Sequence, residues 1–176
     1  INAGSSVTMN YGDAFRSDVL LDGAGNVYVA SNTASADFPG LGTGFNGAYR
    51  GGTSDGVVCK LPPNLSAVTW AGLLGGSGAD AAYSMQRDDQ GRVYVCGGTR
   101  SPDFPTSAGA YLATRPGGVD GFAARISADG RALERATYVG TAGYDQAQFL
   151  QLDAAGNPYL LGQTLGGAFP VTAGLY

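Results

Sequence analysis

The stretch Asp88-Asp89-Gln90-Gly91-Arg92-Val93-Tyr94-Val95-Cys96 decides the fold, because the chain contains it three times. The other copies are Asp22-Gly23-Ala24-Gly25-Asn26-Val27-Tyr28-Val29-Ala30 and Asp153-Ala154-Ala155-Gly156-Asn157-Pro158-Tyr159-Leu160-Leu161. Each copy predicts a turn followed by a strand, since Asp bonds its own backbone, Gly permits a positive φ, and β-branched and aromatic residues follow. The glycines Gly25, Gly91 and Gly156 stand at intervals of 66 and 65 residues. A fixed period of this size indicates a stacked or radial repeat.

Three further landmarks recur in the same order and with the same period. They are a Phe-Pro pair, an Asp-Gly pair after Gly-Gly, and an Asp that follows glycine-containing sequence. Their residues are Phe38, Phe104 and Phe169; Asp55 and Asp120; and Asp13, Asp80 and Asp145. Because all the landmarks share one phase, the chain divides into the end of a preceding repeat unit (1–10), two whole units (11–75 and 76–140) and a partial unit (141–176), all in one domain.

Each whole unit predicts four strands. They are Phe15–Asp22, Asn26–Ala30, Gly56–Leu61 and Ala67–Ala71 in the first unit, and Ala82–Asp88, Arg92–Gly97, Gly121–Ile126 and Ala132–Val139 in the second. Helices are not predicted, because Gly or Pro interrupts every apolar stripe of helical period. The sequence therefore predicts an all-β fold with about two and a half blades of a β-propeller, an architecture of four-stranded antiparallel blades. Further parts of the same longer polypeptide are expected to complete the ring, because an open array would expose strand edges.

Composition and charge exclude several classes of function. The chain has 176 residues, of which 30 are Gly, none is His and 44% are hydrophobic, and its net charge is −4. No apolar run approaches the roughly 18 residues that span a bilayer, so no membrane insertion is predicted. The acidic balance, without a run of Lys or Arg, argues against a nucleic-acid partner. The lack of His removes the usual proton shuttle, Ser-His and Cys-His pairs, and the commonest transition-metal ligand.

The two cysteines, Cys59 and Cys96, are too few for a disulfide scaffold or a zinc cluster. In the repeat they take the places of small or apolar residues, which favours buried free thiols. A disulfide between neighbouring units is the other interpretation, and it requires Cα atoms within about 7 Å.

The combined motif is specific even though its parts are weak. It reads Asp-x-x-Gly-Asn-Val-Tyr-Val, Thr-x-Ser-x-Asp-Phe-Pro, Gly-Ala-Tyr, Gly-Gly-x-Asp-Gly-Phe-x-Ala-Arg-Ile and Ala-Thr-Tyr-Val-Gly-x-x-Gly-x-Asp. Over nearly all of its length the chain resembles the bacterial SBBP family, named for its seven-bladed β-propeller repeat. The resemblance implies a large secreted or cell-surface protein, often from Bacteroidetes and associated with gliding motility or type IX secretion. The third unit departs from the pattern, with Pro158 inside a strand and Ala168 where Asp37 and Asp103 stand.

The repeated aspartates are the candidate metal ligands. Asp13, Asp55, Asp80, Asp120 and Asp145 lie in Gly-rich loops at equivalent places. One hypothesis is that these loops bind Ca²⁺, which takes six to eight oxygen ligands. The other is that each Asp caps a turn or holds the next blade through backbone N–H groups. The second is favoured, because each landmark has a single carboxylate and no Asp-x-Asp-x-Asp run is present. Apart from possible calcium, no cofactor is predicted.

No catalytic constellation is predicted. The acids outside the repeat, Asp88-Asp89 and Glu134, are interpreted as solvated surface, and no cluster of arginines accompanies a tyrosine nucleophile as in sialidases. The repeated Tyr28, Tyr94 and Tyr159, like the repeated phenylalanines, are interpreted as packing between blades. The sequence thus predicts a non-catalytic extracellular scaffold or adhesion module whose Gly-rich loops bind a protein or glycan. The alternative is an accessory propeller of a secreted carbohydrate-active enzyme, with catalytic groups elsewhere.

Overall fold

The computed structural model describes residues 16–166 and 168–171, which form strands, turns and loops. Its strands are β1 (Asp18–Leu21), β2 (Val27–Thr33), β3 (Asp55–Leu61), β4 (Trp70–Leu74), β5 (Asp80–Arg87), β6 (Val93–Thr99), β7 (Asp120–Ile126), β8 (Leu133–Val139), β9 (Tyr144–Leu152) and β10 (Pro158–Leu165). The all-β prediction is therefore confirmed. In this described part, no helix has the length and apolar character needed to cross a membrane.

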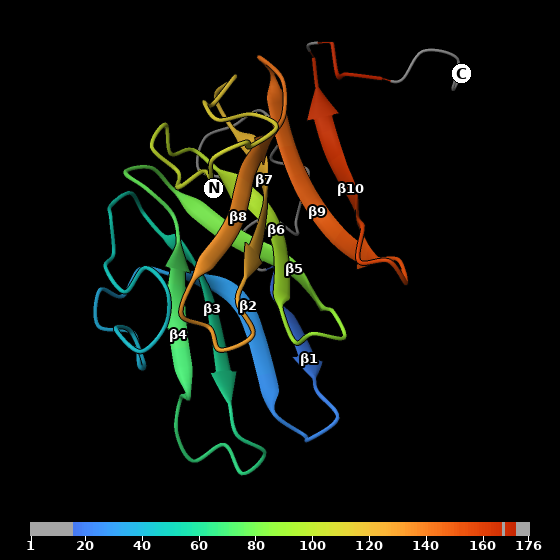
Figure 1. The fold of residues 1–176 in the computed structure, drawn as a ribbon. Helices are drawn as coiled ribbons and strands as arrows, with labels where there is room; N and C mark the ends of the chain where they lie inside the picture. The colour runs from blue at the N-terminus through green and yellow to red at the C-terminus, as the bar shows by residue number, and fades with distance from the viewer. Residues whose placement is uncertain (1–15, 167, 172–176) are drawn as a thin grey trace.

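The strands form three antiparallel sheets, each built from consecutive strands (Figure 1). The first sheet is β1–β4, the second sheet is β5–β8, and the third sheet is β9–β10. The two larger sheets share one register: β2 and β3 pair from Val27↔Leu61 to Thr33↔Asp55, and β6 and β7 pair from Val93↔Ile126 to Thr99↔Asp120. The equal register shows that the sequence repeat is also a repeat of backbone structure.

The strand prediction is wrong by three residues in the last strand of the first sheet. The sequence predicts Ala67–Ala71, whereas β4 runs Trp70–Leu74. Val68 and Thr69 are β-branched, as is typical of strands, but the turn before them includes Leu65 in the left-handed region, at φ 55°. The ladder with β3 begins only at Trp70, opposite Lys60. Turn geometry here overrides local β-propensity.

The sheets pack face to face across their inner strands. β5 lies across β1, β2 and β3 of the first sheet, and β9 lies across β5, β6 and β7 of the second sheet. Apolar side chains from both sheets fill the first of these interfaces, among them Tyr28, Trp70, Met85 and Phe122. The second interface holds a smaller cluster, which is Tyr94, Cys96, Ala147 and Leu150 with Leu152 beside it.

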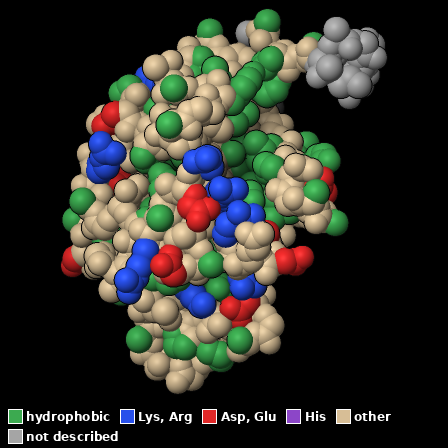
Figure 2. Space-filling model, in the orientation of Figure 1, with side chains coloured by type: hydrophobic (Ala, Val, Ile, Leu, Met, Phe, Trp, Pro, Cys, Tyr) green, Lys and Arg blue, Asp and Glu red, His purple; other side chains and the backbone are tan. Residues whose placement is uncertain are grey.

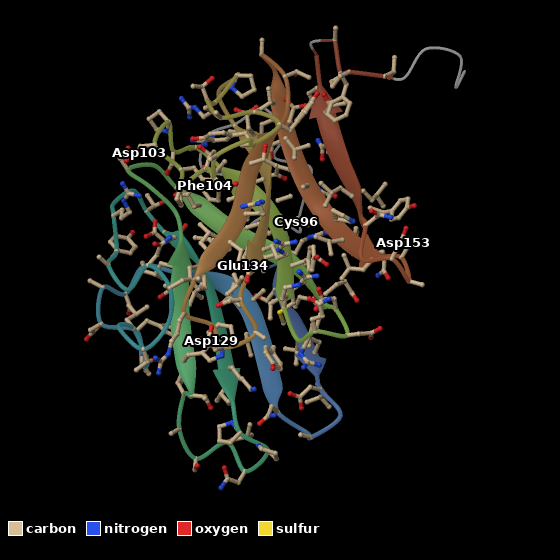
Figure 3. The ribbon with its side chains drawn as sticks, in the orientation of Figure 1. Cys96, Asp103, Phe104, Asp129, Glu134 and Asp153 are labelled. Carbon is tan, nitrogen blue, oxygen red and sulfur yellow. The ribbon has the colours of Figure 1, made fainter. Side chains whose placement is uncertain are left out.

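Tight turns join strands at one end of the sheets, the turn edge. Gly25, Gly91 and Gly156 have φ of 79°, 83° and 80°, in the region that only glycine adopts readily. In the β9–β10 turn, labelled at Asp153 in Figure 3, the Asp Oδ1 accepts hydrogen bonds from the N–H groups of Ala155 and Asn157. Each repeated turn is thus built by its aspartate and its glycine.

Long loops lie at the opposite end of the sheets, the loop edge. Residues 34–54 connect β2 to β3, and residues 100–119 connect β6 to β7. Arg50 of the first loop lies 3.7 Å from Asp103 of the second, the residue labelled at the upper left of Figure 3. The loop edge therefore gathers the longest irregular segments of the described chain on one side.

Candidate functional site

The repeated aspartates lie at the loop edge, where the strands begin. Asp55, Asp80 and Asp120 are the first residues of β3, β5 and β7, and Asp145 is the second residue of β9. All four are buried. Asp13, the fifth candidate, lies outside the described residues.

The structure joins these aspartates in two pairs, each from non-equivalent positions. Asp55 and Asp80 both lie against Gly75, where an added Cβ would collide with Asp55 Oδ1 and come within 2.9 Å of Asp80 Oδ2. Asp120 and Asp145 surround Gly140 in the same way, with Asp145 Oδ2 at 3.1 Å from such a Cβ. Each pair therefore joins the third strand of one sheet to the first strand of the next, and glycine leaves room for it.

One oxygen of each aspartate accepts hydrogen bonds from the connection beside it. Asp80 Oδ2 accepts from the Gly76 N–H at 2.9 Å and from the Ser101 hydroxyl at 2.6 Å. Asp145 Oδ2 accepts from the Thr141 N–H at 2.7 Å and from its hydroxyl at 2.9 Å. These contacts hold the segment between successive sheets, as expected for a carboxylate that pins backbone N–H groups.

The other carboxylate oxygen has fewer hydrogen-bond partners. Among the described residues, Oδ1 of Asp55, Asp120 and Asp145 is buried and has no hydrogen-bond partner. Burial, with a contribution from the nearby charge of Asp80, raises the pKa of Asp55 to about 6. Burial also raises the pKa of Asp120 to about 6, with a contribution from Asp145. A buried carboxyl with these neighbours takes up a proton more readily than an ordinary aspartate.

The calcium hypothesis stays a prediction. Each pair presents two carboxylates, whereas Ca²⁺ takes six to eight oxygens, so backbone carbonyls or water would have to supply most ligands. In the described residues, no group of three or more acidic, His or Cys side chains is placed to hold a metal ion. The hydrogen bonds to Gly76 and Thr141 give the aspartates a structural task in any case.

The motif Thr-x-Ser-x-Asp-Phe-Pro forms a hydrogen-bonded cluster on the loop edge, here called the polar lock. The sequence analysis did not assign a role to this motif. Thr99 Oγ1 accepts the Ser101 N–H, and Ser101 Oγ donates to Asp80 and accepts the N–H groups of Gly76 and Gly78. Asp103 Oδ1 accepts the Ser77 N–H at 2.7 Å and its hydroxyl at 2.8 Å, which lowers the pKa of Asp103. The signal was the motif itself, which repeats in the sequence without an evident partner.

Phe104 and Tyr138 extend the lock into the core. The Tyr138 hydroxyl donates to Ser101 O at 2.8 Å and accepts the Phe104 N–H at 3.0 Å. The Phe104 ring lies 4.6 Å from the Phe122 ring and 5.7 Å from the Tyr138 ring, centroid to centroid. Of the repeated aromatic residues, Tyr28, Tyr94 and Phe104 are buried, whereas Tyr159 and Phe169 are exposed and Phe38 is partly buried.

Asp88 and Glu134 are partly buried beside arginines, so the interpretation as solvated surface fits only Asp89, which is exposed. Asp88 Oδ2 accepts from Arg92 Nε at 2.7 Å, and Glu134 Oε2 lies 2.9 Å from Arg125 Nε. Figure 2 shows Lys, Arg, Asp and Glu side chains interspersed in the middle of this face, with no large field of one sign. Asp88 and Glu134 therefore each have an arginine as a charge partner.

Cys59 and Cys96 are both buried free thiols, in β3 and β6. Burial raises the pKa of Cys59 to about 11 and that of Cys96 to about 12. A thiol reacts through its thiolate, so neither cysteine has the character of a nucleophile.

Comparison with known proteins adds no family: no family model matches the chain, and no curated protein matches it at a significant level. The resemblance to the SBBP repeat therefore stays a prediction from the motifs.

Proposed function

We propose that the sheets are successive blades of a β-propeller and that the chain is a non-catalytic scaffold or adhesion module. It acts outside the cell or on a bacterial cell surface. There it presents the long Gly-rich loops of the loop edge to a protein or a glycan.

The arrangement of the sheets supports the propeller. The two larger sheets have the same consecutive strand order and the same register. The first strand of each following sheet crosses the preceding one. Radial repetition of four-stranded antiparallel sheets is the pattern of propeller blades.

The observation that carries the binding role is the anchoring of the loops. Ser101 and Asp103 tie the loop 100–119 to the connection before β5 by accepting its N–H groups, and the half-exposed pair of Arg50 and Asp103 joins the loop 34–54 to it. Loops that are held before a ligand arrives lose less conformational entropy when it binds. Tyr111, on the second loop, is 63% exposed, and an exposed tyrosine offers a large contact surface at little entropic cost.

A binding screen tests this proposal. The chain is applied to a glycan array and to immobilised extracellular proteins, beside a double variant Arg50→Ala and Tyr111→Ala. The matched control is Gln90→Ala, in an exposed turn at the turn edge. We expect a ligand whose affinity falls at least tenfold in the double variant and is unchanged in the control.

Two results would overturn the proposal. Equal binding by the double variant would show that the loop edge is not the contact surface. Turnover of a bound glycan by the chain would contradict a non-catalytic role.

A further inference from the structure

β10 has an open edge where its equivalents have a partner strand. β2 pairs with β1 and β3, and β6 pairs with β5 and β7. Within the described residues, β10 pairs only with β9. Figure 1 shows β10 at the right margin of the molecule, with β9 on one side of it. An unpaired edge offers N–H and C=O groups to an incoming strand.

Apolar residues around this edge are exposed where their equivalents are buried. Val95 of β6 is 0% exposed, whereas Leu160, at the same place in β10, is 36% exposed. Phe104 is 3% exposed, whereas Phe169 is 43% exposed. In the second sheet the cover comes from β7 and β8, because Phe104 packs against Phe122 and Tyr138.

A cavity of about 190 Å³ lies beside β10, and Val139, Ala147, Leu160 and Phe169 contribute to its wall. Their equivalents in the preceding interface are Leu74, Ala82, Val95 and Phe104, which belong to the same buried cluster as Phe122. Gly162, also in the wall, takes the place of Gly97, which pairs with Phe122. A Cβ on Gly97 would come within 2.8 Å of the Phe122 ring. The cavity thus occupies the place that an aromatic ring fills one repeat earlier.

The pairing of β6 with β7 also shows which residue comes two positions before the aromatic residue in the covering strand. Thr99 pairs with Asp120 and Gly97 pairs with Phe122. Thr164 and Gly162 hold the corresponding places in β10. An incoming strand in this register would place an Asp opposite Thr164 and an aromatic residue opposite Gly162.

We propose that β10 and this cavity form a docking site for an antiparallel β-hairpin of the same repeat type, with the pattern Asp-x-aromatic in its first strand. The aromatic side chain enters the cavity opposite Gly162, and the second strand covers Phe169. This inference rests on the propeller arrangement proposed above. The affinity comes from main-chain hydrogen bonds, and the specificity from the aromatic pocket, as in other cases of strand addition.

The chain itself supplies the probe. A fluorescent peptide of residues 117–140, which contains β7 and β8, is titrated into the intact chain. We expect saturable binding and slower hydrogen exchange of the β10 amide groups that do not bond to β9. The matched peptide with Phe122→Ala is expected to bind at least tenfold more weakly. Equal binding of the two peptides, or binding without protection of β10, would overturn the proposal.

A second experiment attaches the hairpin to the chain itself, so that no separate peptide has to bind. The chain is extended after Tyr176 with a copy of residues 112–140, which keeps the repeat in phase because Tyr176 takes the place of Tyr111. We expect β10 protection and a higher Tm, and neither effect when the copy of Phe122 is replaced by Asp. If neither the peptide nor the extension protects β10, the docking site is refuted.

A second copy of the chain is the competing occupant. Protection of β10 that rises with concentration and accompanies a dimer mass would assign the edge to self-association and overturn the proposal. Loss of ligand binding in the Arg50 and Tyr111 variant tests the loop edge alone, so the two proposals fail separately.

Discussion

The two interfaces between sheets begin from equivalent inner residues, but among the described residues only the first is filled as far as its outer strands. Tyr28 and Trp70 of the first sheet face the second, with ring centroids 6.2 Å apart and an edge-on geometry. The β7–β8 turn lies over Trp70 so closely that a Cβ on Gly130 would collide with the indole ring. Four strands of the second sheet cover this surface from its inner to its outer strands.

In the part of the chain that the structure describes, the second interface is closed along its inner half alone. Tyr94 and Cys96 are buried under Ala147 and Leu150 of β9, as their equivalents are in the first interface. Towards the outer strands, a cavity of about 280 Å³ is lined by residues that include Ala123, Arg125 and Arg135. The two faces repeat one sequence pattern at their inner strands, and both are buried there. Towards the outer strand they differ in residue, with Trp70 in one and Arg135 in the other, and in the number of covering strands.

The largest effect is expected when the outer-strand side chain of each face is truncated to alanine. Trp70→Ala should cost about 3 to 5 kcal/mol, because it leaves a cavity in a filled interface. Arg135→Ala, at the equivalent position, should change the free energy of unfolding by less than about 0.5 kcal/mol, as exposed substitutions do. Urea unfolding of both variants measures the contrast, and equal losses would refute it.

The buried carboxyl pairs are a feature that both interfaces share, and they predict a pH dependence. The folded pKa of Asp55 and of Asp120 is raised from 3.8 to about 6, so the folded state binds more protons than the unfolded state between these values. Stability from this source is therefore fully present below pH 3.8 and is lost as pH rises through about 6. We expect a loss of about 2 kcal/mol for each pair between pH 4.5 and 7.5.

The matched variants are Asp55→Asn and Asp120→Asn, which keep the shape of the side chain and remove its titration. The double variant should lose the part of the pH dependence that Asp55 and Asp120 contribute, measured by urea unfolding. A remainder is expected from Asp80, whose pKa burial also raises. Asp22 is the control of opposite sign, because its pKa is lowered to about 2 and its contribution disappears only as pH falls through that value. A wild-type chain that gains stability up to pH 7.5 would contradict the prediction.

The carboxyl pairs also show what the sequence allows one to predict. The repeat groups Asp55 with Asp120, and Asp80 with Asp145, because a period reveals equivalence. The contacts join Asp55 to Asp80 and Asp120 to Asp145, which are non-equivalent residues on successive sheets. Turns and strands follow from local chemistry, and the sequence predicts them to within a few residues, as the displaced bounds of β4 show. Contacts between sheets depend on how the sheets stack, which the period alone does not contain.

The polar lock at the loop edge distinguishes the second sheet from the third. Ser101 and Asp103 correspond to Gly166 and Ala168, so the third loop lacks both side chains. The double variant Ser101→Gly and Asp103→Ala should cost about 2 kcal/mol, because it removes the bonds to Asp80 and Ser77 and leaves buried groups unpaired. Hydrogen exchange should accelerate in residues 100–119 while β6 and β7 stay protected. Uniform acceleration along the chain would show global destabilisation instead of a loosened loop.

The smallest effect is expected at the repeated turns. Gly91 and Gly156 have nearly the same φ, but their surroundings differ. Gly156→Ala should cost about 1 kcal/mol, since the left-handed region disfavours an alanine and its Cβ would meet only the Tyr94 hydroxyl, at 3.9 Å. Gly91→Ala should cost more, because its Cβ would come within 3.3 Å of Ala128 and would also displace the Arg87 guanidinium. Thermal unfolding of the two variants separates backbone strain from crowding. If the Gly156 variant loses more stability than the Gly91 variant, crowding at Gly91 is not what separates the two turns, and the prediction is wrong.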